Sequence, residues 1–207
     1  MRRPRDHHII DRVGAVRAAR LFSNVVSPPV MFAVLGLLLA WTELPPLPAL
    51  AWAAAYGFFV SLAPILLVLH LLHTGRVAEL HMSNTAERHL PYLAAGVSSA
   101  LVLALIFFLD GPELLRCLTA FNIVTLVILG IINTRWLISF HASAASALLV
   151  VVALVFGPGV GLVLLPLLLV TIAVRLYLRR HTVAEIVGGI IVGGGSVLLL
   201  TPFGCFV

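Results

Sequence analysis

The chain has 207 residues, of which 61% are hydrophobic and 10% charged, and its mean hydropathy is +1.15. Such a composition excludes a soluble globular domain and indicates an integral membrane protein. The net charge is +5 and every basic side chain other than histidine is an arginine, which favours phosphate groups and anionic membrane lipids over nucleic acid as partners.

The N-terminal stretch is rich in arginine, with apolar side chains between the arginines at near-helical spacing. We expect residues 1–24 to form a basic amphipathic segment on the membrane surface, ahead of a single transmembrane domain over residues 25–207. A cleaved signal peptide is the competing interpretation. No convincing small-residue cleavage site follows Pro28-Pro29, so we assign the first apolar stretch as a retained anchor.

Seven apolar stretches follow, separated by short breaks rich in residues that end helices. Their unbroken hydrophobicity favours helices over barrel strands, which alternate apolar and polar residues. The sequence therefore predicts an all-α integral membrane protein, a helical bundle of about seven transmembrane helices, with six also compatible with the length. The predicted stretches are residues 25–41, 49–69, 90–109, 114–132, 139–156, 160–178 and 184–201.

If these helices alternate in direction, every arginine except Arg116 and every histidine falls on one face of the membrane. The positive-inside rule then places the N-terminus and this face in the cytoplasm, for a multi-pass protein of the cell (cytoplasmic) membrane. Cys117 and Cys205 fall near the opposite face. They are either small apolar core residues or a disulfide, and the sequence leaves both open.

Three polar clusters share the arginine-rich face because each is two crossings from the next. They cover residues 81–89, 138–143 and 174–185. Charged groups at membrane depth are costly, so clusters of this kind indicate a functional site.

The clusters contain groups that suit a phosphate. Arg88 and Arg175 are planar cations that can contact phosphate oxygens in pairs. Ser139 stands where it would cap the fifth predicted helix, so its hydroxyl and the following N–H groups would present a helix N-terminus to an anion.

The clusters also contain groups for proton and phosphoryl transfer. His141 and His181 are two imidazoles that can divide the roles of nucleophile and general acid. Glu185 follows His181 by one helical turn, where its carboxylate can orient the ring.

These residues resemble the signature of the type 2 phosphatidic acid phosphatase superfamily, over about residues 75–195. Its three elements are Lys-(six residues)-Arg-Pro, Pro-Ser-Gly-His and Ser-Arg-(five residues)-His-(three residues)-Asp. This chain aligns with them through His81-(six)-Arg88-His89, Ser139-Phe140-His141 and Arg175-(five)-His181-(three)-Glu185.

The resemblance implies a metal-independent lipid phosphatase without a cofactor, working through a phosphohistidine. His181 would attack phosphorus, Glu185 would orient it and His141 would protonate the leaving group. The phosphate would be held by Arg88, Arg175, Ser139 and His81. Compatible substrates are phosphate or diphosphate monoesters with a long apolar tail: polyprenyl phosphates and diphosphates, phosphatidate and phosphatidylglycerophosphate.

The sequence departs from the signature at several positions. Phe140 stands where the family has glycine, so a side chain replaces a close approach of backbone to phosphate. His81 and His89 replace lysine and proline, Ile138 and Val174 replace proline and serine, and Glu185 replaces aspartate. These changes support the alternative that the chain is a catalytically silent relative, acting as a lipid-binding or structural membrane subunit.

Another alternative is a histidine-bound metal in a membrane oxidoreductase, for which His70, His73, His81 and Glu79 are the candidate ligands. We expect interfacial residues there instead, because such enzymes need more closely spaced histidine pairs.

Two arginines and the glycines of the last stretch are expected to have structural roles. Arg179 and Arg180 are expected to be interfacial anchors. The glycines of the last stretch, including Gly189 and Gly193, are expected to allow close helix packing.

Overall fold

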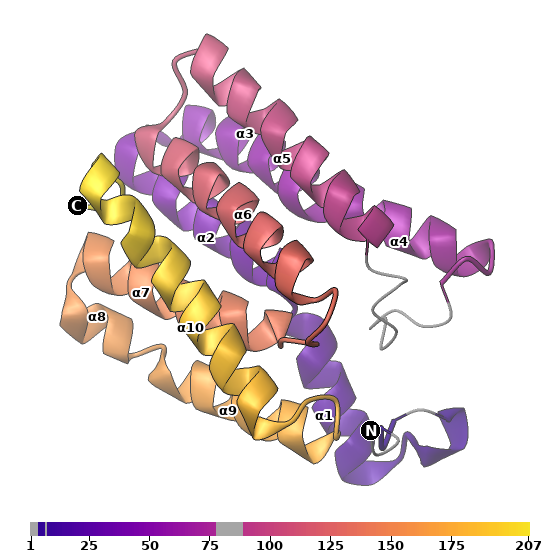
Figure 1. Cartoon of the computed structure of the whole chain (residues 1–207). Coiled ribbons are helices and arrows are strands. Elements are labelled where there is room, and N and C mark those ends of the chain that lie inside the picture. Colours follow the sequence, from indigo (N-terminus) through magenta and orange to yellow (C-terminus); the bar gives the residue numbers. More distant parts are fainter. Residues whose placement is uncertain (1–3, 7, 78–88) are drawn as a thin grey trace.

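A computed structural model describes residues 4–6, 8–77 and 89–207, and in those ranges every regular element is a helix. The elements form one bundle (Figure 1). In order they are η1 (Ile9–Asp11), α1 (Gly14–Val25), α2 (Pro28–Glu43), α3 (Pro46–Gly57), η2 (Phe58–Leu62), α4 (Ala63–His73), α5 (His89–Phe108), α6 (Glu113–Ile132), α7 (Phe140–Phe156), α8 (Pro158–Leu162), α9 (Leu165–Tyr177), α10 (Val183–Leu200) and η4 (Thr201–Phe203).

The all-α prediction is confirmed, and each predicted apolar stretch coincides with helix. Five helical stretches of the described chain are long and apolar enough to cross a membrane: Pro46–His73, His89–Phe108, Glu113–Ile132, Pro158–Tyr177 and Val183–Phe203. α1 and α2 together make a sixth candidate, bent by 43°. α7 is apolar but has 17 residues, about 25 Å at 1.5 Å per residue. Seven crossings, which need α2 and α7 each to span, stay a prediction.

The helical stretch Pro46–His73 is irregular around residue 60, and Pro64 is the cause. Pro64 has no N–H to bond the carbonyl of Val60, so the helix widens into the π-turn η2 just before it. Nearby hydroxyls satisfy backbone carbonyls: Ser98 Oγ donates to the Phe59 carbonyl (2.5 Å) and Ser61 Oγ to the Pro29 carbonyl (2.6 Å). These bonds fasten α5 and α2 to the widened turn.

Glycines of α10 allow it to lie directly against α7. A Cβ added at Gly189 would clash with the Ser139 carbonyl oxygen, and one at Gly193 would clash with the Ser143 carbonyl oxygen. Ser146 Oγ also donates to the Ile190 carbonyl across the same contact (3.1 Å). The expected packing role of these glycines is confirmed, and it brings the beginnings of α7 and α10 together.

The start of α1 and the C-terminal end of α10 lie at opposite ends of the bundle (Figure 1). At the C-terminal end, a disulfide joins Cys117 near the start of α6 to Cys205 after η4. The same end is tied by Glu43 Oε2, which accepts from the Leu114 N–H that opens α6 (3.0 Å). The question left open by the sequence is therefore answered in favour of a disulfide.

Candidate functional site

A cavity of about 370 Å³ is lined by residues from the end of α1, from α2, α4, α5, α6, α7 and α9, and from the turn before α10. Its walls are mainly apolar, and three predicted site residues open onto it. The lining residues include His141, Arg175 and His181 with Ser23, Asn24, Tyr92, Phe140, Pro29, Pro64 and Leu126. The structure thus brings together side chains from two of the three predicted clusters.

Arg175 reaches the cavity from the last turn of α9 and is almost fully buried. The helix ends just beyond it in a tight reversal: the Arg180 N–H donates to the Arg175 carbonyl (3.1 Å), and Arg179 takes the left-handed conformation with φ of 54°. This is the Schellman arrangement that commonly ends helices, here with an arginine at the position that favours glycine. The reversal places His181 beside Arg175.

His181 is held by two acceptors on one ring nitrogen. Its Nδ1 lies 3.2 Å from Glu185 Oε2 and 3.3 Å from the Leu137 carbonyl oxygen. A carboxylate oxygen and a carbonyl oxygen only accept hydrogen bonds, so Nδ1 carries the proton that they share. In the neutral ring the lone pair is therefore on Nε2. The contact between His181 and Glu185 that the sequence predicted is present.

Glu185 also belongs to a capping box that the sequence analysis overlooked. Thr182 Oγ1 accepts from the Glu185 N–H (3.3 Å), while Glu185 Oε2 accepts from the Thr182 N–H (3.0 Å). The pattern Thr182-Val183-Ala184-Glu185 is the usual sequence sign of such a start. The same carboxylate therefore begins α10 and orients His181.

Ser139 caps α7 as predicted, and His141 follows one residue into the helix. The Ser139 hydroxyl accepts from the Ala142 N–H (3.4 Å), and the Ser139 N–H donates to the Glu185 carbonyl (3.1 Å). Ser139 is fully buried and stands outside the cavity lining, whereas His141 is part of that lining. The structure uses Ser139 to position α7 against α10.

Ser23, at the end of α1, is a site residue that the sequence analysis missed. Its hydroxyl accepts from Arg175 Nη1 (2.9 Å), and its carbonyl oxygen accepts from His141 Nε2 (3.0 Å). The hydroxyl is also 3.4 Å from the same imidazole nitrogen. A single serine in an arginine-rich segment gives no sequence signal of this role.

A buried ion-pair cluster beside the cavity holds the N-terminal segment in place. Both carboxylate oxygens of Asp6, which is fully buried, bond the Arg180 guanidinium at 2.9 Å, and Arg20 Nη1 bonds Oδ2 at 2.9 Å. The prediction that Arg180 is an interfacial anchor is wrong, because its charge is buried against Asp6. Arg179 is exposed.

The N-terminal segment was predicted to lie on the membrane surface, and the structure instead docks part of it on the bundle. The Arg5 N–H donates to the Leu178 carbonyl (3.1 Å), and the Arg5 guanidinium lies over the Tyr177 ring, 4.6 Å from its centroid. α1 exposes Leu21 and Val25 and buries Ser23, in keeping with an amphipathic helix.

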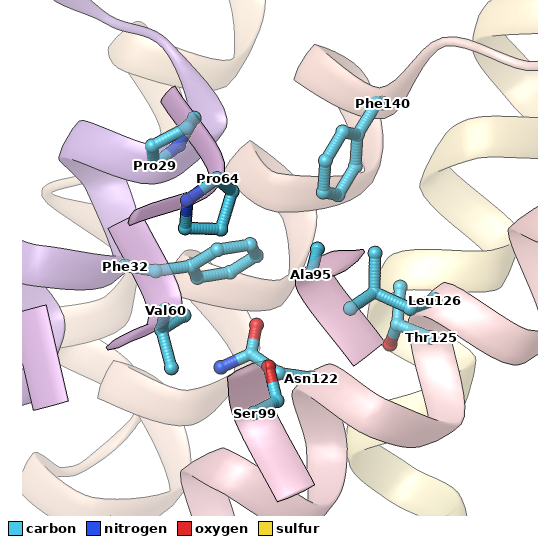
Figure 2. Close-up of a pocket in the computed structure, with 10 residues that line it drawn as sticks. All are labelled: Pro29, Phe32, Val60, Pro64, Ala95, Ser99, Asn122, Thr125, Leu126 and Phe140. Carbon is cyan, nitrogen blue, oxygen red and sulfur yellow. The ribbon is translucent and has the colours of Figure 1, made fainter. Parts of the chain in front are cut away.

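Phe140 lines both this cavity and a smaller one of about 60 Å³. Figure 2 shows the Phe140 ring on one side of this smaller cavity and the side chains of Asn122 and Ser99 on the other, with Phe32 beside them. Asn122 there donates to the Tyr56 hydroxyl (2.6 Å), while the buried Ser99 hydroxyl has no hydrogen-bond partner among the described residues. The residue that replaces the family glycine therefore contributes its ring to the walls of both cavities.

Part of the predicted site lies outside the described residues. His81 and Arg88, both expected to bind phosphate, fall there, as does Glu79. His70 and His73 are described and are exposed at the end of α4. Within residues 4–6, 8–77 and 89–207, no group of three His, Cys, Asp or Glu side chains could hold a metal ion.

Comparison of the chain with protein-family models, with curated proteins and with solved structures found no match.

Proposed function

We propose that this protein is a membrane-embedded phosphatase that hydrolyses a phosphate or diphosphate monoester of a long-chain lipid. One observation carries the proposal: His141, Arg175 and His181 open onto one cavity, and His181 is oriented by Glu185 through Nδ1. A nucleophile within hydrogen-bond reach of a group that orients or activates it is the general sign of covalent catalysis, and Glu185 holds His181 in this way. The sequence resemblance assigns the same residues to the same roles.

The proposed reaction has two steps. His181 Nε2 attacks phosphorus as the bond from phosphorus to the ester oxygen breaks, and His141 gives its Nε2 proton to the departing oxygen. Water then attacks the phosphohistidine, His141 takes the proton from that water, and the bond between phosphorus and nitrogen breaks to release inorganic phosphate. Arg175 stabilises the charge on the transferred group, and its burial strengthens that interaction.

The apolar walls of the cavity support a substrate with a hydrocarbon tail. Pro29, Pro64 and Leu126 line it beside the three polar side chains, and its volume suits a headgroup with the first part of a chain. Polyprenyl phosphates and diphosphates, phosphatidate and phosphatidylglycerophosphate all meet this description. A site for a soluble phosphate ester would have more polar walls.

The test is release of inorganic phosphate from these lipids by the purified protein in detergent, with a chelator present. His181→Ala is expected to reduce the rate by at least roughly 10³-fold, because it removes the nucleophile. His70→Ala is the matched control, since His70 is exposed at the end of α4 and should leave the rate unchanged. Full activity of His181→Ala, or loss of wild-type activity with the chelator, would refute the mechanism.

The second candidate function is a silent relative that binds a lipid headgroup without turnover. Phe140 favours it, because an aromatic ring lines the cavity where the family has glycine. In that case the wild-type protein would bind these lipids and release no phosphate from any of them.

We further propose that the site faces the cytoplasm. The arginine distribution supports this orientation through the positive-inside rule. The disulfide at the opposite end of the bundle supports it independently, because disulfides persist in oxidising compartments and the cytosol keeps thiols reduced.

A further inference from the structure

Ser23 holds two of the groups that the proposed reaction needs. Its hydroxyl accepts from Arg175 Nη1, and its carbonyl accepts the Nε2 proton of His141. In the proposed reaction the Nη1 hydrogen of Arg175 would contact the phosphate, and the Nε2 hydrogen of His141 would contact the leaving oxygen. A phosphate that binds between Arg175 and His141 therefore competes with Ser23 for the Nε2 proton of His141 and for one donor nitrogen of Arg175.

The helix that carries Ser23 is fixed by the Asp6 ion pairs. Arg20 lies one turn before Ser23 on α1, so the bond from Arg20 to Asp6 acts on the part of the helix nearest the cavity. Asp6 is in turn anchored to the bundle by its two bonds with Arg180, which follows α9. Arg180 is nearly fully buried, so this anchor is shielded from solvent.

The break between α1 and α2 would allow α1 to move from the cavity to the membrane interface. Val26 and Ser27 separate α1 from α2, and the two helices meet at 43°. α1 already exposes Leu21, Val25 and Arg17, and apolar side chains together with arginine are the combination by which an amphipathic helix binds a membrane interface. Rotation about residues 26–27 would exchange the contacts of Ser23 for membrane contacts.

We propose that α1 is an autoinhibitory gate, in which Ser23 closes the phosphate site and the Asp6 ion pairs hold it closed. This inference rests on the proposed phosphate site, and it predicts that entry of a phosphate group is coupled to displacement of α1. An amphipathic helix that gains membrane contacts as it opens would favour lipid substrates presented in a bilayer.

The test uses orthovanadate, a phosphate mimic, titrated calorimetrically into the full-length protein in detergent. Ser23→Ala is expected to bind vanadate roughly tenfold more tightly, because it removes a competing acceptor of a charged donor. Asp6→Asn is expected to tighten binding in the same direction and to speed amide exchange over Gly14–Val25. Asp11→Asn is the matched control, because Asp11 is an exposed carboxylate of the same segment and should change neither measurement.

Weaker vanadate binding by Ser23→Ala would overturn the gate, since it would mean that Ser23 helps to bind the anion. Unchanged binding by both variants would overturn it as well. Ser23→Ala leaves the ion pairs intact, so it decides the question even if Asp6→Asn does not fold.

Vanadate binding and lipid hydrolysis separate this inference from the proposed function. Tighter binding without phosphate release from any lipid would support the gate and refute the phosphatase. Phosphate release with unaltered binding in both variants would do the reverse. Absence of vanadate binding in every variant would refute the phosphate site and the gate together.

Discussion

Glu185 interacts with two chemically different partners. Its carboxylate accepts from the backbone N–H of Thr182 and faces Nδ1 of His181, and it is nearly fully buried. Only the second contact bears on the proposed phosphoryl transfer, in which a negative charge would stabilise the imidazolium and fix the tautomer. The first contact is a matter of helix stability.

Two substitutions separate these contributions. Glu185→Gln keeps an acceptor for the Thr182 N–H and removes the charge, so we expect the rate of phosphate release to fall by roughly 10²–10⁴-fold with little change in the melting temperature. Thr182→Ala removes the cap hydroxyl and should lower the free energy of unfolding by about 1 kcal/mol while the rate is retained. Thermal unfolding and lipid hydrolysis of the two purified variants measure both effects. A wild-type rate of phosphate release in both variants would mean that Glu185 acts only as a cap.

At the same scale, burial distinguishes arginines that the sequence presents alike. Arg175, Arg179 and Arg180 are close neighbours at the end of a hydrophobic helix, where arginines usually anchor a span. Arg175 and Arg180 are buried against Ser23 and Asp6, and only Arg179 is exposed. The partners of the buried pair are more than 150 residues earlier in the chain, so no local pattern indicates them.

The contact between α7 and α10 is the element-scale feature that assembles the site. His141 enters the cavity from the start of α7, and His181 and Glu185 flank the start of α10. Backbone oxygens of α7 lie against glycines of α10, so the distance between the helices depends on the absence of side chains there. The small-residue spacing predicted close helix packing, and the structure identifies α7 as the partner helix.

A glycine substitution tests this dependence. Gly193→Ala would place a methyl group against the Ser143 carbonyl oxygen, and we expect it to cost about 1–3 kcal/mol of stability and to reduce phosphate release by separating His141 from His181. Gly195→Ala is the control on the same helix, because a Cβ there meets no atom within 4 Å. Melting temperatures of the two variants in detergent give the comparison. Equal stability would show that the helices can move apart without cost.

At the scale of the whole molecule, the side of the membrane that the cavity faces determines which pool of lipid phosphates can reach it. The arginine-rich end carries the cavity, and the disulfide lies at the other end. An impermeant thiol reagent added to intact cells distinguishes the two ends. Exposed positions are available at both, at Thr74 after α4 and at Leu47 near the start of α3.

We expect Leu47→Cys to be modified in intact cells and Thr74→Cys only after the membrane is permeabilised. The native cysteines are consumed in the disulfide, so they add little background. Labelling in the opposite order would overturn the cytoplasmic assignment of the site and leave the phosphatase proposal intact.

The sequence by itself determined the helical class, the positions of the apolar helices, the Ser139 cap, the contact of His181 with Glu185 and the packing glycines. All of these depend on composition or on spacing within a few residues, which periodicity and capping rules capture. Only the tertiary structure decided that Ser23 lies between Arg175 and His141, that Asp6 pairs with Arg180, and that Cys117 bonds Cys205. Each of these contacts joins residues far apart in the chain, and the pairing is set by how the helices pack rather than by any local pattern.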